Sequence, residues 1–197
     1  MGKVNDYIQK NLKKGPLHFS LIDPDKSKFT PDKLRRTVEL LDKYGTDAIM
    51  VGGSTNIDAN FLDVSIKTIK KYTSKPVILF PGGLNGVSKY ADAIFFMSLL
   101  NSSDPYWIIQ AQSKGSIVVK KFCIEPISMA YIIIEPGMEV GRVGKADVIK
   151  KNEPETAAGY ALAAQYMGMS LVYLEAGSGA PSHVPLKIIK TVSDSID

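Results

Sequence analysis

Six short apolar runs recur along the chain, and polar segments with a helical pattern separate several of them. Most of the runs are followed at once by Gly, Pro, Ser or Asp. Apolar runs of this length, bounded by turn residues, are typical of strands that are buried on both faces of a parallel sheet. The predicted strands are residues 17–22, 47–51, 76–80, 92–99, 127–134 and 171–175.

Two of the intervening segments have the pattern of helices with recognisable ends. Thr30 is predicted to cap the first, with Pro31 in its first turn, and the second repeats this design with Asn152 and Pro154. A hydroxyl or amide side chain at the cap, followed by proline, is a common beginning for a helix. A glycine follows each segment, as is common at the end of a helix.

Strands that alternate with helices predict parallel βα units, and the small residues concentrate just after the strands. This arrangement favours a (β/α)-barrel, a modified TIM barrel whose active site would lie in the loops after the strands. A doubly wound open sheet is the alternative, but no GxGxxG sequence follows the first run. Residues 81–91 are too few for an ordinary crossover helix, so an extended or short connection is expected there.

Composition narrows the class of protein. With 197 residues, 45% hydrophobic and 22% charged, the chain has the composition of a soluble globular protein, and we expect a single domain, residues 1–197. The sequence shows no secretory signal and no apolar run of transmembrane length, so a cytoplasmic location is expected. The net charge of +4 comes from scattered lysines, which favours an anionic small substrate or an anionic membrane surface over nucleic acid. Cys123 is the only cysteine, which excludes a disulfide framework and a cysteine metal cluster.

The first predicted strand lies in the sequence LHFSLIDPDK and ends at Asp23, Pro24 and Asp25. Proline and aspartate end a strand and favour a turn. A carboxylate at the C-terminal end of a strand is also a common place for chemistry in α/β proteins. The stretch alone leaves both interpretations open.

The last predicted strand leads into the sequence YLEAGSGAPSHVP. Tyr173 and Glu175 should point the same way, because side chains alternate along a strand. Gly177, Ser178 and Gly179 follow, and glycines let backbone N–H groups approach an anion such as phosphate closely. An ordinary loop is the alternative for the Gly-Ser-Gly sequence, whereas a carboxylate beside it needs a partner.

The sequences HFSLIDPDK, IMVGGST, VILFPG, FFMSLLNSSDPYW and YLEAGSGAPSHVP occur in this order. Together they resemble the geranylgeranylglyceryl phosphate synthase family, the archaeal ether-lipid enzymes to which the PcrB-like prenyltransferases are related. The resemblance implies a modified TIM barrel with one outer helix replaced by an extended connection. It also implies Mg²⁺-dependent transfer of the prenyl group of geranylgeranyl diphosphate to sn-glycerol 1-phosphate, with release of diphosphate. The alternatives are a relative that uses a longer or different prenyl donor and a non-catalytic phosphate-binding barrel.

The resemblance also assigns roles to residues. It implies that Asp23 and Ser54 bind Mg²⁺ and that Glu175 takes the proton from the attacking hydroxyl. The residues that it implies for glycerol phosphate binding are Tyr173, Leu174, Glu175, Ala176, Gly177, Ser178 and Gly179.

The prenyl chain needs an apolar groove, for which Tyr106, Trp107 and Tyr131 are the candidates, with core packing as the alternative for each. Arg142 and Lys145 lie in a loop that either clamps the diphosphate or is simply solvated.

The chain departs from the family in one respect, because only six strands are predicted where a closed barrel of this type has eight. We therefore expect the barrel to be incomplete at its C-terminal end, with two βα units missing, and the alternative is that the remaining strands come from elsewhere. A homo-oligomer is expected, and a transient membrane contact is left open.

Overall fold

The computed structural model of the chain describes residues 2–25, 30–53 and 58–197. It contains two compact units. Unit 1 consists of Met1–Phe95 and Lys114–Ile127, and unit 2 consists of Phe96–Ser113 and Ser128–Asp197.

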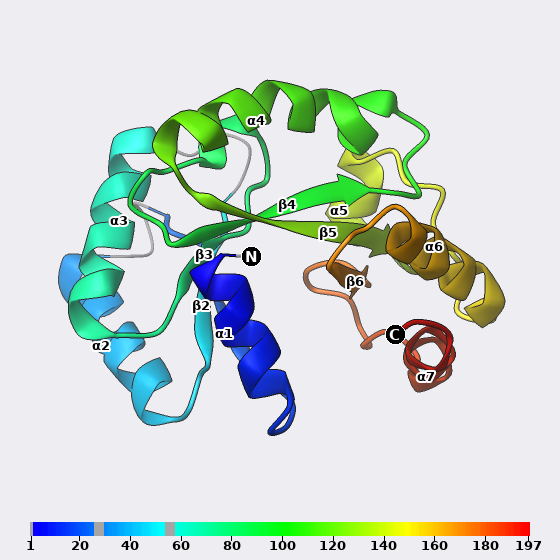
Figure 1. Cartoon of the computed structure of the whole chain (residues 1–197), viewed down its shortest axis with the longest axis horizontal. Coiled ribbons are helices and arrows are strands. Elements are labelled where there is room, and N and C mark those ends of the chain that lie inside the picture. The colour runs from blue at the N-terminus through cyan, green and yellow to red at the C-terminus, as the bar shows by residue number, and fades with distance from the viewer. Residues whose placement is uncertain (1, 26–29, 54–57) are drawn as a thin grey trace. The chain divides into compact units, whose positions relative to one another are not determined.

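In the described residues, six strands follow one another in the sheet in the order of the sequence (Figure 1). The pairs β1–β2, β2–β3, β3–β4 and β5–β6 are parallel. Each strand overlaps one of the predicted apolar runs, so the predicted alternation of parallel strands and helices is confirmed. The strands are β1 (Phe19–Ile22), β2 (Ala48–Val51), β3 (Val77–Leu79), β4 (Ala93–Leu99), β5 (Glu125–Ile133) and β6 (Leu171–Glu175).

Helices connect the strands, and two short irregular helices complete the described elements. Between β3 and β4 the chain forms only a three-residue 3-10 helix, η1 (Leu84–Gly86). A π-helical turn, η2 (Tyr106–Gln110), precedes α4. The α-helices are α1 (Lys3–Leu12), α2 (Pro31–Lys43), α3 (Ala59–Tyr72), α4 (Ala111–Phe122), α5 (Met138–Val143), α6 (Pro154–Tyr166) and α7 (Leu186–Ser195).

The core of unit 1 forms where helices cover β2 and β3, whose residues are all buried. Helices α2 and α3 lie next to each other (Figure 1) and bury apolar side chains such as Val38 and Ile66. The predicted cap of α2 is confirmed, because the Thr30 hydroxyl accepts a hydrogen bond from the N–H of Lys33 and Pro31 is the first helical residue. This packing fixes the C-terminal ends of β1 and β2, and Asp23 is the residue directly after β1.

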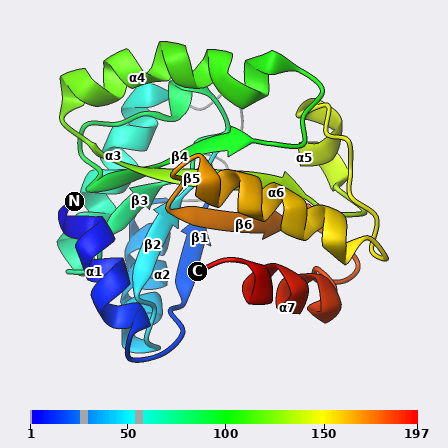
Figure 2. The same cartoon turned by 45° about the vertical axis from the view of Figure 1, so that its right-hand side comes forward.

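The core of unit 2 forms between β5, β6 and the helices α6 and α7, which lie beside β6 (Figure 2). The predicted cap of α6 was wrong. Pro154 is the first helical residue, so Glu153 rather than Asn152 occupies the cap position, and its side chain makes no capping hydrogen bond. The core consists of Ile132, Ile134, Ile149, Ala157, Ala158, Ala161, Ala176, Val184, Ile188 and Val192.

Strand β6 differs from the expectation of burial on both faces, because its five residues are only partly buried. Among the described strands it pairs with β5 alone, so it is an edge strand. One face of β6 packs on the core of unit 2 through Val172 and Leu174. The other face carries Tyr173 and Glu175, which are therefore available for a site.

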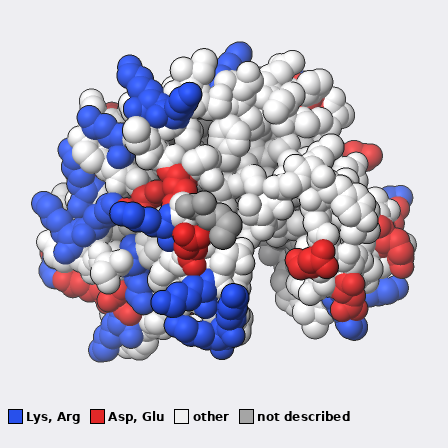
Figure 3. Space-filling view, in the orientation of Figure 1, with Lys and Arg blue, Asp and Glu red and all other residues white. Residues whose placement is uncertain are grey.

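Charge is divided unequally between the units. Unit 1 contains most of the Lys and Arg residues, whereas unit 2 has more acidic than basic residues. Figure 3 shows blue Lys and Arg side chains gathered over the helices of unit 1. Within the described ranges, no helix has both the length and the apolar character needed to cross a membrane.

Candidate active site

Strand register in unit 2 brings two tyrosines and a glutamate together. Tyr131 of β5 pairs with Tyr173 of β6, and Ile133 pairs with Glu175. Because side chains alternate along strands, Tyr131, Tyr173 and Glu175 project from one face. The rings of Tyr131 and Tyr173 are in contact, with centroids 5.4 Å apart. The prediction that Tyr173 and Glu175 share a face is thus supported by the register.

The carboxylate of Glu175 is held by two donors. Its Oε1 accepts a hydrogen bond from the N–H of Gly177 at 2.6 Å, and its Oε2 accepts one from the hydroxyl of Tyr131 at 3.2 Å. These contacts fix the orientation of the carboxylate. A carboxylate has about four acceptor positions, so each oxygen can still accept from a further donor.

The two tyrosines remain protonated near this carboxylate. Burial, followed by the charge of Glu175, raises the pKa of Tyr131 far above its usual range. The same two causes, in the same order, raise the pKa of Tyr173. Tyr131 therefore keeps the proton that it donates to Glu175 at any pH at which the protein would work.

The glycine-rich turn after β6 lies against the beginning of α5. Gly177 is buried and has a φ of +100°, and the N–H of Gly137 donates to the carbonyl of Ala176 at 3.0 Å. A Cβ on Gly177 would lie 2.5 Å from the Cβ of Met138 and 2.9 Å from the carbonyl carbon of Gly137. Ser178 and Gly179 are exposed beyond this contact. The turn thus has a closely packed base and an open tip.

A Gly177→Ala substitution should destabilise the protein more than Gly179→Ala. Both glycines have positive φ, which costs a residue with a Cβ roughly 1–2 kcal/mol. Only Gly177 adds a steric conflict, which typically costs about 1–3 kcal/mol more, because no atom lies within 4 Å of a Cβ on Gly179. Urea unfolding of both variants measures the difference. Equal losses of stability would contradict the packing described here.

Asp23 lies directly after β1, beside the end of β2. The N–H of Gly52 donates to the carbonyl of Ile22 at 2.9 Å. A Cβ on Gly52 would collide with Oδ1 of Asp23 and would lie 3.1 Å from Cδ1 of Leu21. The carboxylate of Asp23 therefore occupies space that is open only because residue 52 is glycine. Asp23 itself is exposed, and Ser54, its predicted partner, lies outside the described residues.

Tyr106 and Trp107 begin η2, and their rings meet edge-on with centroids 4.9 Å apart. Both are partly buried. Tyr131, the third groove candidate, is almost fully buried, and its hydroxyl donates to Glu175. The structure thus brings Tyr106 and Trp107 together as one aromatic pair and places Tyr131 with the carboxylate.

Arg142 and Lys145 were predicted to lie in a loop, but Arg142 is part of the short helix α5, and both cations have carboxylate partners. Arg142 pairs with Glu139 within α5. Lys145 pairs with Asp104, with 2.8 Å between Nζ and Oδ2. Asp104 follows β4, and the pair joins residues that are 41 positions apart in the sequence.

Asn101 is a residue that the sequence did not single out. It is 2% exposed, and its Nδ2 donates to the carbonyls of Ile133 at 2.9 Å and Asp147 at 2.8 Å. Its Oδ1 accepts from the N–H of Ile133 at 3.0 Å. Asn101 therefore fixes the end of β5 and the loop that follows it. The polar sequence NSSDP after a predicted strand was the only signal for such a role.

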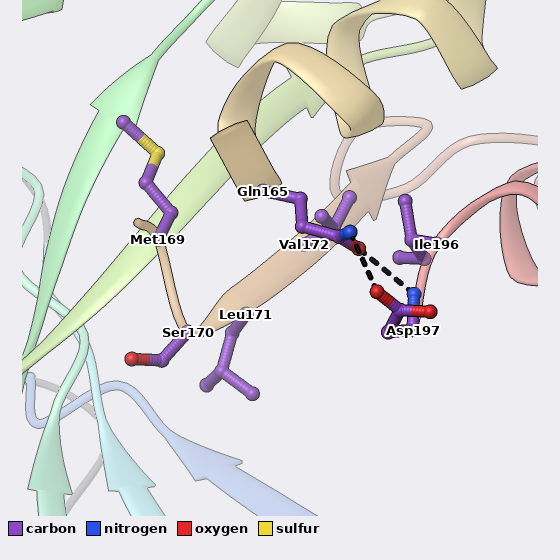
Figure 4. A pocket seen from close by; sticks show the side chains of 7 residues that line it. All are labelled: Gln165, Met169, Ser170, Leu171, Val172, Ile196 and Asp197. Carbon is purple, nitrogen blue, oxygen red and sulfur yellow. Dashed lines mark hydrogen bonds between the residues drawn. The ribbon is translucent and has the colours of Figure 1, made fainter. Parts of the chain in front are cut away.

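A pocket in unit 2 lies at the beginning of β6 (Figure 4), whereas Glu175 is the last residue of that strand. The side chain of Gln165 donates to Asp197 at 2.9 Å and accepts from its N–H at 2.8 Å, which closes one side. The pocket is lined by Gln165, Met169, Ser170, Leu171, Val172, Ile196 and Asp197. None of these residues is among the predicted substrate-binding residues, so the pocket and the candidate site are separate.

The paired strands described above are parallel, and the ordered carboxylate of Glu175 lies at the end of one of them. This is an α/β protein whose candidate active site lies at the ends of the strands and in the loops that follow them. A family model, the PcrB family, matches residues 7–197. The chain belongs to the PcrB family. The resemblance seen in the sequence is confirmed at this level.

Similar proteins agree with this assignment. Geranylgeranylglyceryl phosphate synthase of Pyrococcus horikoshii is 54% identical over 197 residues, which are 100% of this chain and 77% of that protein. The protein of the same name from Methanothermobacter thermautotrophicus is 48% identical over 195 residues, covering 99% and 78%. A crystal structure of (S)-3-O-geranylgeranylglyceryl phosphate synthase from Thermoplasma acidophilum, in complex with its substrate sn-glycerol-1-phosphate, is 45% identical with a TM-score of 0.92, covering 100% and 78%.

Proposed function

We propose that this chain transfers the geranylgeranyl group of geranylgeranyl diphosphate to sn-glycerol 1-phosphate, forming an ether and releasing diphosphate. The PcrB family match and the relatives named geranylgeranylglyceryl phosphate synthase support this reaction. The observation that carries the proposal is the carboxylate of Glu175, held by Gly177 and Tyr131 beside a glycine-rich turn. The chain is then a prenyltransferase.

In this proposal Glu175 is the general base. The glycerol hydroxyl oxygen bonds to the terminal carbon of the prenyl group while the bond from that carbon to diphosphate breaks, and the hydroxyl proton passes to Glu175. The carboxylate is suited to this role because its two present donors hold it in place without using all its acceptor positions. The protonated Tyr131 maintains that orientation throughout.

Glycerol phosphate binding is proposed for the residues at the end of β6. Tyr173 and Glu175 would contact the substrate with their side chains, and the backbone N–H groups of the exposed residues Ser178 and Gly179 would approach the phosphate. Leu174 and Ala176 pack into the core of unit 2, so their contribution would come from backbone atoms.

Mg²⁺ binding is proposed for Asp23 and Ser54. In the described residues no group of three or more His, Cys, Asp or Glu side chains could hold a metal ion. Mg²⁺ suits such a site, because it commonly takes one or two carboxylates and completes its coordination with water and substrate phosphates. The space that Gly52 leaves for the Asp23 carboxylate fits this donor set. When bound, Mg²⁺ would neutralise the diphosphate and stabilise it as a leaving group.

We propose a barrel-type architecture in which the short connection containing η1 stands in place of an outer helix. A homo-oligomer and a cytoplasmic location stay predictions, and so does a transient membrane contact, which the basic residues of unit 1 would favour.

An assay with Mg²⁺, labelled sn-glycerol 1-phosphate and prenyl diphosphates of graded length tests the proposal. We expect ether formation with geranylgeranyl diphosphate to be the most efficient, as judged by kcat/KM. A higher kcat/KM for a longer or shorter donor would instead identify a relative with a different donor. Binding of glycerol phosphate without any product would support a non-catalytic phosphate-binding barrel.

A further inference from the structure

The loop after β4 and the segment after β5 are joined by several polar contacts within unit 2. Ser102 and Ala146 form an isolated antiparallel bridge. The Ser102 hydroxyl donates to the carbonyl of Gly144 at 2.6 Å, and the N–H of Ser103 donates to the carbonyl of Lys145 at 2.9 Å. The two segments therefore form one connected structure, although about forty residues separate them in the sequence.

Asp104 links this structure to the aromatic pair. Its Oδ1 accepts from the N–H of Tyr106 at 2.9 Å, and its Oδ2 accepts from Nζ of Lys145 at 2.8 Å. The Lys145 contact, and then the Tyr106 N–H, lower the pKa of the Asp104 carboxyl, so it is an anion at neutral pH. Asp104 thus holds the first N–H of the π-helical turn with one oxygen and a lysine of the neighbouring loop with the other.

The turn that carries the aromatic pair has further fixed points in its interior. The Ser98 hydroxyl donates to the carbonyl of Ile108 at 2.6 Å, and Nε2 of Gln112 donates to the carbonyl of Trp107 at 2.9 Å. A π-helical turn is uncommon and often lies at functional sites, because it re-aims side chains relative to an ordinary helix. The beginning of the turn is held by Asp104, and Asp104 is held by Lys145.

The segment of Lys145 also reaches the candidate base. Near its beginning, Gly137 and Met138 pack against Gly177, whose N–H holds the carboxylate of Glu175. Near its end, Lys145 holds Asp104. One short segment, residues 137–146, therefore contacts both the Glu175 turn and the residue that caps the aromatic turn.

We infer that Lys145 is a positioning residue that acts through Asp104 to hold the Tyr106–Trp107 pair in the orientation that receives the hydrocarbon chain of the prenyl donor. The inference rests on the proposed function, because it takes the aromatic pair as part of the donor site. Lys145 differs in this from Arg142, which has the same charge in the same segment but pairs with Glu139 of its own helix.

The experiment compares Lys145→Met with Arg142→Met, and it includes Lys145→Arg as the conservative variant. Trp107 is the only tryptophan of the chain, so its fluorescence reports on this turn without any turnover. We expect Lys145→Met to increase the quenching of Trp107 fluorescence by acrylamide and Arg142→Met to leave the quenching unchanged. In Lys145→Arg the quenching should equal that of the wild type.

The second measurement is ligand binding. Binding of geranylgeranyl diphosphate is followed by the fluorescence of Trp107, and binding of inorganic diphosphate is followed by calorimetry. Lys145→Met should lower the affinity for geranylgeranyl diphosphate about two- to fivefold, which is the range expected for loss of one partly exposed ion pair. Its affinity for inorganic diphosphate should stay at the wild-type value, because the positioning acts on the hydrocarbon chain.

Two outcomes would overturn the inference. If Lys145→Met lowered the affinity for inorganic diphosphate as much as the affinity for the full donor, Lys145 would contact the diphosphate directly. If Arg142→Met matched Lys145→Met in quenching and affinity, the Asp104 contact would have no special role. The proposed function is judged separately, because a wild-type protein that binds the donor but forms no ether would refute the transfer reaction and leave these binding results intact.

Discussion

Asp23→Asn should remove most of the prenyl transfer activity at limiting Mg²⁺ while leaving the fold intact. Asparagine keeps the size of the side chain but replaces an anionic oxygen ligand with a neutral one, which a hard cation binds less strongly. Loss of an outer-shell partner of a metal ligand already costs about 10- to 100-fold in metal affinity, so loss of a direct ligand should cost at least as much. Initial rates across a Mg²⁺ series measure the effect.

Gly52→Ala tests the same site by changing the space beside Asp23 rather than Asp23 itself. The backbone of Gly52 is not in the left-handed region, so the added methyl group conflicts only with its neighbours, and chiefly with the Asp23 carboxylate. We expect this variant to need more Mg²⁺ for half-maximal rate. Ser54→Ala should be milder than Asp23→Asn, because water can replace a neutral ligand.

Asp25→Asn is the matched control, since it makes the same change two residues further along the Asp-Pro-Asp sequence. Its Mg²⁺ dependence should equal that of the wild type. The metal assignment would be wrong if Asp23→Asn kept wild-type rates at limiting Mg²⁺, or if Asp25→Asn lost as much activity as Asp23→Asn.

The elements of the fold could be predicted because their signals are local. An apolar run such as Ala48–Val51 is buried along its whole length, and Thr30 followed by Pro31 marks a helix beginning with short-range chemistry alone. The cap at Asn152 was missed by one residue, since Pro154 is itself the first helical residue and its predecessor takes the cap position. Such errors at helix ends are small because neighbouring residues compete for one role.

The candidate site was predictable only in part, because only some of its contacts have a local signal in the sequence. Alternation along a strand was enough to place Tyr173 with Glu175. The hydroxyl of Tyr131 reaches Glu175 from a residue 44 positions away, and Asn101 binds backbone groups 32 and 46 positions away. These contacts follow from strand register and loop packing, which no short stretch of sequence contains. The sequence therefore predicted Tyr131 only as a groove candidate or a core residue, without its contact with Glu175.

Glu175→Gln should reduce kcat by about 10²- to 10⁴-fold, the usual contribution of a positioned general base, while sn-glycerol 1-phosphate binds with near wild-type affinity. Glutamine can preserve both contacts in the structure. Its Oε1 can accept from the N–H of Gly177, and its Nε2 can donate to the hydroxyl of Tyr131, which is able to reverse its role. What glutamine cannot do is accept the proton of the attacking hydroxyl.

Tyr131→Phe separates the orientation of the carboxylate from its basicity. This variant removes one donor to Glu175 but leaves the base and the Gly177 contact in place, so its kcat should fall much less than that of Glu175→Gln. The competing explanation is that Glu175 only anchors the glycerol hydroxyls or closes the turn at Gly177. In that case Glu175→Gln would chiefly weaken substrate binding and would leave kcat within a few-fold of the wild type. Measuring kcat and the glycerol phosphate dissociation constant separately for both variants therefore decides whether this carboxylate moves a proton or only holds the substrate.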